Sequence, residues 1–491
     1  MGSDLAAQQA RAGFFAAHGY TPIDLRWYAG VDQLGYSLIS QPVMALLGVR
    51  LTGALSLLAS AVLFALLLRR TNAARPFLGA AVGTACLAGN LVSGRVTYGL
   101  GVCLALGALV TLTTGPSAPR PRAYAWLTAL LALLAGATSP VVALFLGLTG
   151  VALILSGRLR SGLLLAIPAA VPLAATALLF GDGGWMNISR TDTLRAVVAG
   201  LVVAALVPRR PVRIGALLSS AGVLAAALIH TPVGLNATRL AVMFTLPLLA
   251  AYAAIPHRRA PRPLPVWAVL ILVAAACWWQ PPVVTGDVRD IGNPTADPAY
   301  FRPLLDRLAQ EDLTGRVEIP ATRDYWEAAH MGDVPLARGW LRQADIDRNP
   351  LFFTDIPGAR GTGVPLTADT YRAWLDDLAV QFVAVPDAEL TWSGRPEAEL
   401  ITAGLPYLTE LWSNSNWRLY AVTNPKPIVG APARLVRQDA ASLIIDTAPG
   451  TIPVRIRWSR WLTVDNGATL QRQGDWTAVE VTNQGRYTIG S

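Results

Sequence analysis

The sequence predicts a polytopic α-helical membrane bundle of about ten spans, followed by an α/β layer and a small antiparallel β domain. The first reason is composition: 53% of the 491 residues are hydrophobic and only 14% are charged, whereas soluble domains carry about 25% charged residues. The second is that long apolar segments are confined to residues 43–282. We expect an external stretch at 1–42, the bundle at 43–282, an α/β domain at 283–425 and a β-sandwich-like domain at 426–491.

The apolar half divides into segments that approach the length of one membrane crossing, for which roughly 20 largely apolar residues are needed. We predict helices at 43–68, 77–93, 97–113, 124–138, 140–156, 162–180, 193–208, 214–230, 240–256 and 265–280. The block from 124 to 156 is one apolar run in the sequence. We divide it at Ser139, because Pro140 cannot donate a backbone hydrogen bond and the small polar residues before it favour a turn.

Positive charge alternates along the turns between these segments. Alternate turns carry clusters of basic residues: Arg69, Arg70 and Arg75; Arg120 and Arg122; Arg158 and Arg160; Arg209, Arg210 and Arg213; and His257, Arg258, Arg259 and Arg262. The intervening turns, SGRVTYG, TSP, GDGGWMNISRTD and HTPVGLNATR, carry fewer. Because basic residues in short loops mark the cytoplasmic side, we expect residues 1–42, the intervening turns and residues 283–491 on the outer side. The net charge of +9 is then an orientation signal and does not indicate a nucleic-acid partner.

The polar stretch 1–42 precedes the first apolar segment and has no signal-peptide pattern. It concentrates side chains that could bind or activate a substrate: Asp4, Gln8, Arg11, Asp24, Trp27, Tyr28 and Tyr36. Asp4, Gln8 and Arg11 recur at helical spacing, so a helix would place them on one face. A carboxylate at a membrane surface, here Asp4 or Asp24, can act as general base on a hydroxyl or can hold a divalent cation. The alternative is a solvated amphipathic helix and loop packed on the bundle.

A second group of candidate residues lies at the predicted outer ends of the apolar segments. Arg95, Arg190 and Arg239 are the cations there, and Tyr98 and Asn236 lie close to them in the sequence. Guanidiniums at this depth are costly unless paired, and they suit a lipid phosphate. The alternative is that they reach out to ordinary headgroups. No cysteine or histidine spacing indicates a metal site, so we predict none, and the cofactor remains undetermined apart from the divalent cation considered above.

The outer half alternates short helices and strands up to about residue 425, with Thr367 as a candidate N-cap. Short alternating runs with frequent turn residues follow, which is typical of an antiparallel sandwich or barrel. One part of the α/β region gathers aromatic and charged residues: Tyr325, Trp326, Glu327, His330, Arg338, Trp340 and Arg342. Such side chains suit sugar binding, but a domain interface is the explanation we prefer from the sequence.

Three patterns give the chain a resemblance to the GT-C superfamily of integral-membrane glycosyltransferases, in particular to its actinobacterial members with an extracytoplasmic C-terminal domain. They are the external DLAAQ…HGYTPIDLRWY…GYS stretch, the many-helix region with SGRVTYGLG and TSPVVALFL, and the later GRVEIPATRDYWEAAH…PLARGW…NPLFF. The resemblance implies a polyprenyl-phosphate sugar donor and a catalytic carboxylate in the first external loop. Asp4 matches that carboxylate, and Asp24 is the second candidate. It also implies a transmembrane helix ahead of the loop, which we expect upstream of this sequence.

The leading hypothesis is a multi-pass cell-membrane glycosyltransferase with its C-terminal domain outside the cytoplasm. It would move a sugar from a polyprenyl phosphate to an envelope glycan or lipid acceptor, with Asp4 or Asp24 as the base. The alternatives are a lipid or glycan transporter or flippase, and a non-catalytic envelope-assembly protein. Transporters place polar groups at mid-membrane, whereas the apolar segments here are composed mostly of Ala, Leu, Val and Gly, which argues against transport.

Overall fold

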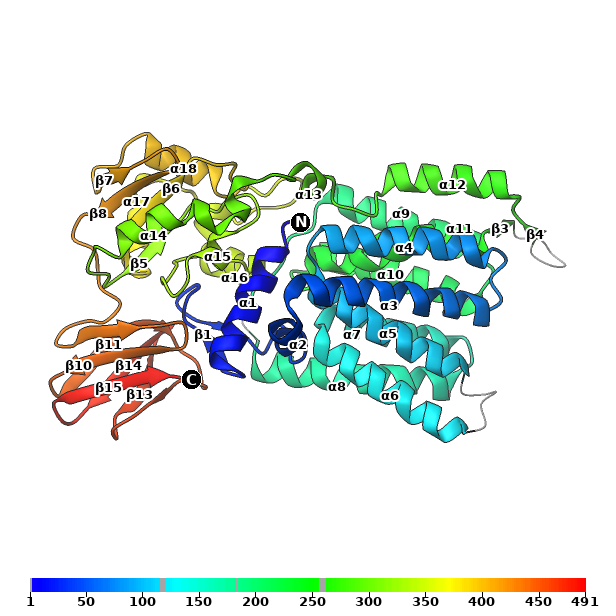
Figure 1. Ribbon diagram of the computed structural model, residues 1–491, viewed down its shortest axis with the longest axis horizontal. Helices are drawn as coiled ribbons and strands as arrows, with labels where there is room; N and C mark the ends of the chain where they lie inside the picture. Colours follow the sequence, from blue (N-terminus) through cyan, green and yellow to red (C-terminus); the bar gives the residue numbers. More distant parts are fainter. Residues whose placement is uncertain (1, 115–119, 182, 256–261) are drawn as a thin grey trace.

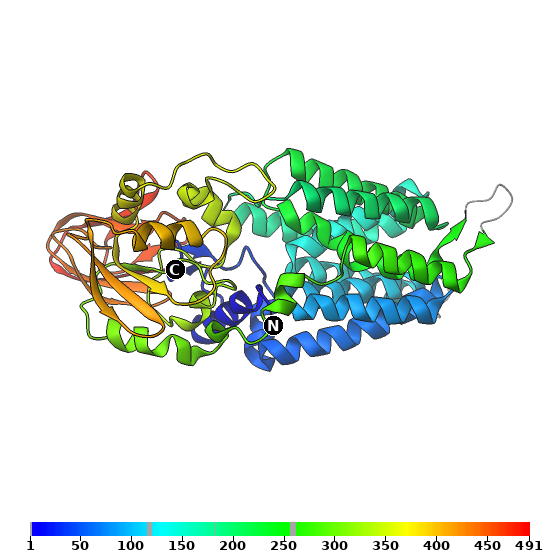
Figure 2. The ribbon, with the colours of Figure 1, turned by 90° about the horizontal axis from the view of Figure 1, so that it is seen from above.

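The computed structural model describes residues 2–114, 120–181, 183–255 and 262–491. It is elongated, with a helical bundle at one end and a β-rich half at the other (Figures 1 and 2). The N-terminal helix α1, Leu5–His18, lies between the two halves (Figure 1). Asp182 of the Gly-rich turn and His257, Arg258 and Arg259 of the last basic turn lie outside the described residues.

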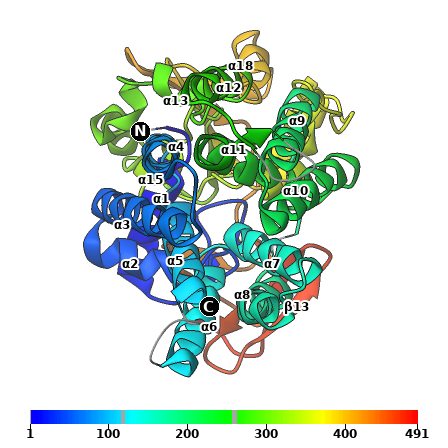
Figure 3. The same cartoon turned by 90° about the vertical axis from the view of Figure 1, so that its right-hand side faces the viewer.

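Ten helices of the described chain lie where the sequence predicts apolar segments, and Figure 3 views this bundle from its far end. They are α3 (Val49–Arg70), α4 (Pro76–Val92), α5 (Val96–Thr114), α6 (Pro121–Thr138), α7 (Pro140–Leu155), α8 (Leu159–Leu179), α9 (Arg190–Leu206), α10 (Arg210–Leu228), α11 (Arg239–Tyr252) and α12 (Val266–Trp279). By length and composition, five of the described helical segments can cross a membrane. The chain is therefore a helical-bundle protein with several candidate membrane spans.

Two breaks in the bundle depend on local chemistry. The predicted turn at Ser139 is confirmed: α6 ends before it, α7 begins after it, and its side chain accepts a hydrogen bond from the backbone N–H of Val142. The predicted segment 43–68 is wrong in its first residues. They belong to a separate short helix, α2 (Ser40–Leu47), because Gly48 takes a φ of +84°, where the helix must stop.

The basic turns have a structural role at the far end of the bundle. The Arg75 guanidinium donates hydrogen bonds to the carbonyls of Ala250, Ala253 and Leu264, and Arg209 donates to two carbonyls after the end of α3. Cations near helix C-termini satisfy carbonyls that have no partner within the helix. These arginines therefore close the ends of helices as well as concentrating positive charge there.

The β-rich half, residues 283–491, lies beyond the end of the bundle, and we call it the outer half for this position in the molecule (Figure 1). It begins with a mixed α/β layer. Its sheet has the order β5-β6-β8-β7, and only β5 and β6 are parallel. The principal elements are α13 (Thr285–Arg289), α14 (Arg302–Leu308), β5 (Arg316–Glu318), α15 (Glu327–His330), α16 (Arg342–Arg348), α17 (Ala368–Asp377), β6 (Val380–Pro386), α18 (Arg395–Thr402), β7 (Leu408–Ser413) and β8 (Trp417–Val422). Thr367 caps α17, as predicted, and the structure adds a reciprocal box with Thr370.

The C-terminal part is an antiparallel sandwich. One sheet has the order β12-β15-β10-β9 and the other β11-β14-β13. The strands are β9 (Arg434–Gln438), β10 (Ser442–Thr447), β11 (Gly450–Arg457), β12 (Thr463–Val464), β13 (Thr469–Gln473), β14 (Trp476–Val481) and β15 (Gly485–Gly490). Trp461 attaches the sandwich to the end of α8: its ring stacks on Phe180 at 4.9 Å, and its indole N–H donates to the Leu179 carbonyl.

Helix α1 joins the two halves. Its buried Leu5, Ala6 and Ala10 share one hydrophobic core with the α/β layer. At its start, the Gly2 N–H donates to the carbonyl of Val92, the last residue of α4. The chain then forms the small ribbon β1 (Ile23–Asp24) and β2 (Val31–Asp32) before α2. The first forty residues therefore form a packed layer between the bundle and the outer half, which we call the junction (residues 2–42).

Candidate functional site: a carboxylate between two arginines

The junction brings together one carboxylate and two guanidiniums from three distant segments. Asp4 precedes α1, Arg95 lies in the turn between α4 and α5, and Arg239 begins α11. The same oxygen, Asp4 Oδ2, accepts hydrogen bonds from Arg95 Nε at 3.1 Å and from Arg239 Nη2 at 3.3 Å. The Asp4 side chain keeps 15% of its surface exposed. We call these three residues the Asp4 cluster.

The Asp4 cluster carries an excess positive charge. Its two guanidiniums face one carboxylate, and arginine does not lose its proton in proteins. The Tyr98 ring lies 5.2 Å from the Arg239 guanidinium, and its buried hydroxyl has no hydrogen-bond partner in the described part of the chain. An additional anion with oxygen acceptors would complete both the charge balance and the hydrogen bonding.

Gln8 lies one helical turn after Asp4 and orders the next part of the site. Its amide donates to the Tyr36 hydroxyl at 2.8 Å, and its carbonyl oxygen accepts from the Thr97 hydroxyl at 2.6 Å. Burial raises the pKa of Tyr36, and the negative charge of Asp4 acts in the same direction. Tyr36 therefore stays a neutral phenol beside the Asp4 cluster.

Arg11 is buried behind Tyr36. Its guanidinium lies 4.1 Å from the Tyr36 ring centroid and 5.6 Å from that of Trp27, and it donates to the Gln33 side chain at 2.8 Å. The predicted common face of Asp4, Gln8 and Arg11 is thus present, but the guanidinium of Arg11 packs inside the junction. Its contacts position Tyr36.

Asp24, the second candidate base, has a structural setting. It is fully buried, and Arg26 binds both of its oxygens, with Nε at 3.0 Å from Oδ1 and Nη2 at 2.7 Å from Oδ2. Gln33 adds a hydrogen bond to Oδ2 at 2.7 Å, and the Arg26 backbone N–H donates to Oδ1 at 2.9 Å. With its charge paired and no exposed surface, Asp24 holds the junction together, and its described hydrogen bonds do not involve the Asp4 cluster.

Trp27 and Tyr28 attach the junction to the α/β layer. Trp27 is fully buried and packs on Gly339, where a Cβ atom would lie 2.5 Å from its ring. The Tyr28 hydroxyl donates to the Gly339 carbonyl and accepts from the Leu341 N–H. These aromatic residues, which the sequence suggests for substrate binding, are used in packing between segments.

Arg190 and Asn236 also lie at the near end of the bundle, but their described contacts do not reach the Asp4 cluster. Arg190 is exposed at the start of α9, and its backbone N–H donates to the Gly358 carbonyl. Asn236 lies in the 3₁₀ turn η2, Gly234–Thr238, and its amide contacts the Met186 sulfur at 3.2 Å. Of the predicted outer-end residues, Arg95, Tyr98 and Arg239 come together with Asp4.

Two residues outside the predicted site complete it. The Thr97 hydroxyl donates a hydrogen bond to Gln8. Its position between the candidates Arg95 and Tyr98 in the sequence is the feature that could have indicated it. Trp340 comes from the outer half: its indole N–H donates to the Ser3 carbonyl at 2.8 Å, and its ring meets the Tyr36 ring edge-on at 6.4 Å. A contact spanning 337 residues has no local signature in a sequence.

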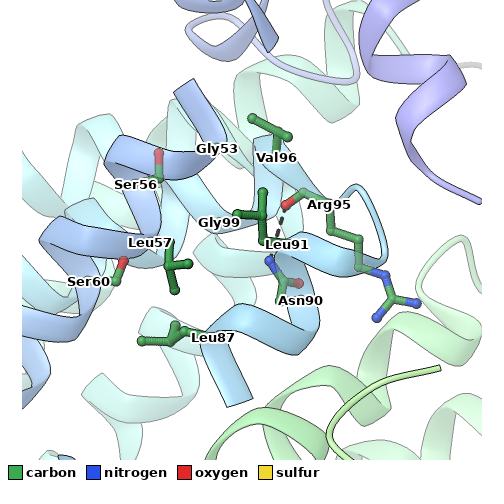
Figure 4. A pocket seen from close by; sticks show the side chains of 10 residues that line it. All are labelled: Gly53, Ser56, Leu57, Ser60, Leu87, Asn90, Leu91, Arg95, Val96 and Gly99. Atoms are coloured by element: carbon green, nitrogen blue, oxygen red, sulfur yellow. Dashed lines mark hydrogen bonds between the residues drawn. The ribbon is translucent and has the colours of Figure 1, made fainter. Parts of the chain in front are cut away.

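A narrow crevice lies between α3, α4 and α5, beside Arg95 of the Asp4 cluster. Leucine, valine and glycine line most of it, and Ser56, Ser60 and Asn90 are its polar side chains. Figure 4 shows that the Arg95 guanidinium points away from this space, toward its Asp4 partner. Within the residues described, no group of three or more His, Cys, Asp or Glu side chains is arranged to hold a metal ion.

The fold and the Asp4 cluster define a class of protein: a helical-bundle protein with several candidate membrane spans and a large β-rich outer half over a charged junction. No protein-family model matches the chain, and no curated protein matches it significantly. The solved structures it resembles are membrane glycosyltransferases of the GT-C superfamily, the superfamily that the sequence resembles.

One is arabinofuranosyltransferase AftD from Mycobacteria, at a TM-score of 0.45 and 18% identity, where the match covers 91% of this chain and 39% of AftD. Another is ArnT from Cupriavidus metallidurans. Its apo structure matches at a TM-score of 0.42 and 13% identity, and its structure bound to undecaprenyl phosphate matches at a TM-score of 0.39 and 14% identity. Both matches cover 86% of this chain and 93% of ArnT. All these TM-scores are below 0.5, so the function proposed below rests on the residues of this chain.

Proposed function

We propose that the chain is a membrane glycosyltransferase that moves a sugar from a polyprenyl-phosphate donor to a cell-envelope acceptor on the outer face. The observation that supports this most directly is the Asp4 cluster. It holds one partly exposed carboxylate and an excess guanidinium charge at the end of an apolar bundle. A lipid phosphate matches the guanidiniums, and a hydroxyl acceptor matches the carboxylate.

The proposed placement puts the bundle in a cell membrane and residues 1–42, 283–425 and 426–491 outside the cytoplasm. Exposed aromatic residues support it, because Trp267 and Trp278, at the two ends of α12, are 67% and 84% exposed. Tryptophan is enriched at both membrane interfaces. The arginine-rich turns lie at the bundle end opposite the outer half, as cytoplasmic turns would.

The geometry supports a simple sequence of events. In the structure Asp4 Oδ2 is occupied by both guanidiniums. A donor phosphate would compete for Arg95 and Arg239 and free Oδ2. Asp4 would then accept the acceptor hydroxyl proton. The resulting oxygen attacks the anomeric carbon, the bond from that carbon to the phosphate oxygen breaks, and the phosphate leaves with the electron pair on the two guanidiniums.

The test is transfer from labelled polyprenyl-phosphate sugars by the protein in proteoliposomes, with a lipid extract of the envelope as acceptor source. We expect Asp4→Asn to lower kcat about 10²–10⁴-fold, the usual contribution of a general base, while polyprenyl-phosphate affinity stays equal or rises. Asp192→Asn is the matched control, since Asp192 is another near-end carboxylate that accepts a hydrogen bond from Ser189. Full transfer activity in Asp4→Asn, or sugar-lipid translocation without transfer, would contradict the proposal.

Asp24→Asn separates the two candidate bases. Because Asp24 is enclosed by Arg26 and Gln33, its replacement should lower thermal stability and leave kcat of the folded fraction close to that of the wild type. A loss of kcat in correctly folded Asp24→Asn that equals the loss in Asp4→Asn would move the base to Asp24.

A further inference from the structure

The α/β layer contains a second cationic group, made of Tyr325, Arg342 and Trp392. Arg342 Nη2 donates to the Tyr325 hydroxyl at 2.9 Å, and its guanidinium lies 5.3 Å from the centre of the Trp392 ring. Its Nε atom is buried and has no hydrogen-bond partner among the residues described. Arg342 and Trp392 are each half-buried, so part of both side chains stays accessible.

Arg342 lacks a counter-ion. Within the described chain, no carboxylate forms an ion pair with it, and its hydrogen-bond acceptor is the Tyr325 hydroxyl. The carboxylate of Asp345, three residues later, is already bound by Arg338 through two hydrogen bonds of 3.0 and 2.9 Å. Arg342 therefore has no carboxylate bound to it directly, and its accessible side can take an anionic ligand.

The backbone at Tyr325 adopts a strained conformation. Tyr325 takes a φ of +58°, a left-handed conformation that bulky residues rarely adopt. Its side chain is nevertheless held at 8% exposure with the hydroxyl on Arg342. Strain of this kind persists where the surrounding structure enforces it, and it concentrates at ligand sites.

The sequence neighbours of Arg342 contact the junction and the bundle. Trp340, two residues before Arg342, bonds the Ser3 carbonyl and contacts Tyr36. Gln343, the next residue, approaches the Pro232 carbonyl in the turn that leads to Arg239. Arg342 is therefore flanked in the chain by one residue that contacts the junction and one that contacts a turn of the bundle.

We propose that Tyr325, Arg342 and Trp392 form an acceptor subsite for an anionic carbohydrate. The Arg342 guanidinium would bind a carboxylate or phosphoryl group of the sugar, for which its planar fork is suited, and the Trp392 indole would support the ring. That the bound sugar is the acceptor of the reaction rests on the proposed function. The binding of an anionic sugar at Arg342 is independent of that function and can be measured separately.

The experiment uses the full chain in nanodiscs and measures binding of three probes: a glucuronate-containing hexasaccharide, a neutral hexasaccharide, and undecaprenyl phosphate. We expect the anionic oligosaccharide to bind in preference to the neutral one. Arg342→Gln should weaken its binding at least tenfold and leave the affinity for undecaprenyl phosphate unchanged. Arg395→Gln is the control, since Arg395 is an exposed arginine of the same layer, and it should change nothing.

Three outcomes would overturn the subsite: wild-type protein that binds no anionic oligosaccharide, Arg342→Gln that binds it normally, or an equal loss of undecaprenyl-phosphate binding, which would assign Arg342 to the donor. If Arg342→Gln fails to fold, Arg342→Lys and Trp392→Ala give the same test. The lysine variant keeps the charge and loses the fork, and it should bind with intermediate affinity. Failure of the proposed function would appear instead as unchanged transfer in Asp4→Asn.

Discussion

Two charged clusters in this molecule contain carboxylates and guanidiniums in opposite proportions. In the Asp4 cluster, one carboxylate faces two guanidiniums. In the α/β layer, the Arg338 guanidinium lies within 4 Å of three buried carboxylates: Glu318, Asp345 and Glu397. We call these four residues the Arg338 cluster. One cluster has spare positive charge at an accessible junction, and the other has spare negative charge in a closed interior.

The difference matters because the excess charge of each cluster is neutralised in a different way. Burial raises the pKa of Glu318 well above its ordinary value, and the neighbouring Glu397 carboxylate adds to the effect. Burial likewise raises the pKa of Glu397 to about 7. The Arg338 cluster can therefore neutralise its excess by keeping protons. The guanidiniums of the Asp4 cluster cannot lose theirs, so an anion from outside is what neutralises them. The Arg338 cluster is structural, and the Asp4 cluster is suited to a ligand.

The largest expected effect comes from breaking the Arg338 cluster. Arg338→Gln leaves Asp345 and Glu397 without their charged hydrogen-bond donor and should lower the free energy of unfolding by about 3–5 kcal/mol, the usual cost of removing one partner of a buried ion pair. Thermal unfolding of the detergent-solubilised protein measures it. Arg395→Gln serves as the exposed control. An unchanged melting temperature would show that the cluster is not a structural element.

These clusters also show what could be predicted from the sequence. The helices and the break at Ser139 were predictable because apolar runs and proline act locally, whereas the helix break at Gly48 depends on one glycine that an apolar run conceals. Asp4 and Arg95 were candidates by residue type. The pairing of Asp4 with Arg95 and Arg239 was not predictable, because these residues are 91 and 235 positions from Asp4 in the chain. Asp24 resembled Asp4 as a residue, and only packing shows that it is enclosed.

The second-largest expected effect is a dependence of the folding stability on pH, caused by Glu327 beside the Arg338 cluster. Glu327 lines the same small cavity as Glu318 and Arg338, and burial raises its pKa to about 7 from an ordinary 4.5. The folded state thus binds a proton that the unfolded state releases above pH 4.5. Its stabilisation is fully present below that pH and is lost as the pH rises through 7, a change of about 3 kcal/mol.

The measurement compares wild-type protein with Glu327→Gln at pH 5, 6, 7 and 8. Because the amide cannot ionise, the variant should gain stability relative to the wild type as the pH rises. The relative melting temperatures should therefore diverge between pH 5 and 8. Parallel curves would mean that Glu327 does not retain its proton in the folded state.

The smallest expected effect on stability belongs to the Asp4 cluster, where function should respond instead. Arg239→Gln leaves Asp4 paired with Arg95, so the free energy of unfolding should change by no more than about 1 kcal/mol, the range for a partly exposed pair. Binding of undecaprenyl phosphate in nanodiscs should weaken about tenfold, the loss of one charge-assisted contact worth roughly 1.4 kcal/mol. Large destabilisation with unchanged lipid binding would make the two clusters alike, both structural, and would remove the asymmetry on which the proposed function depends.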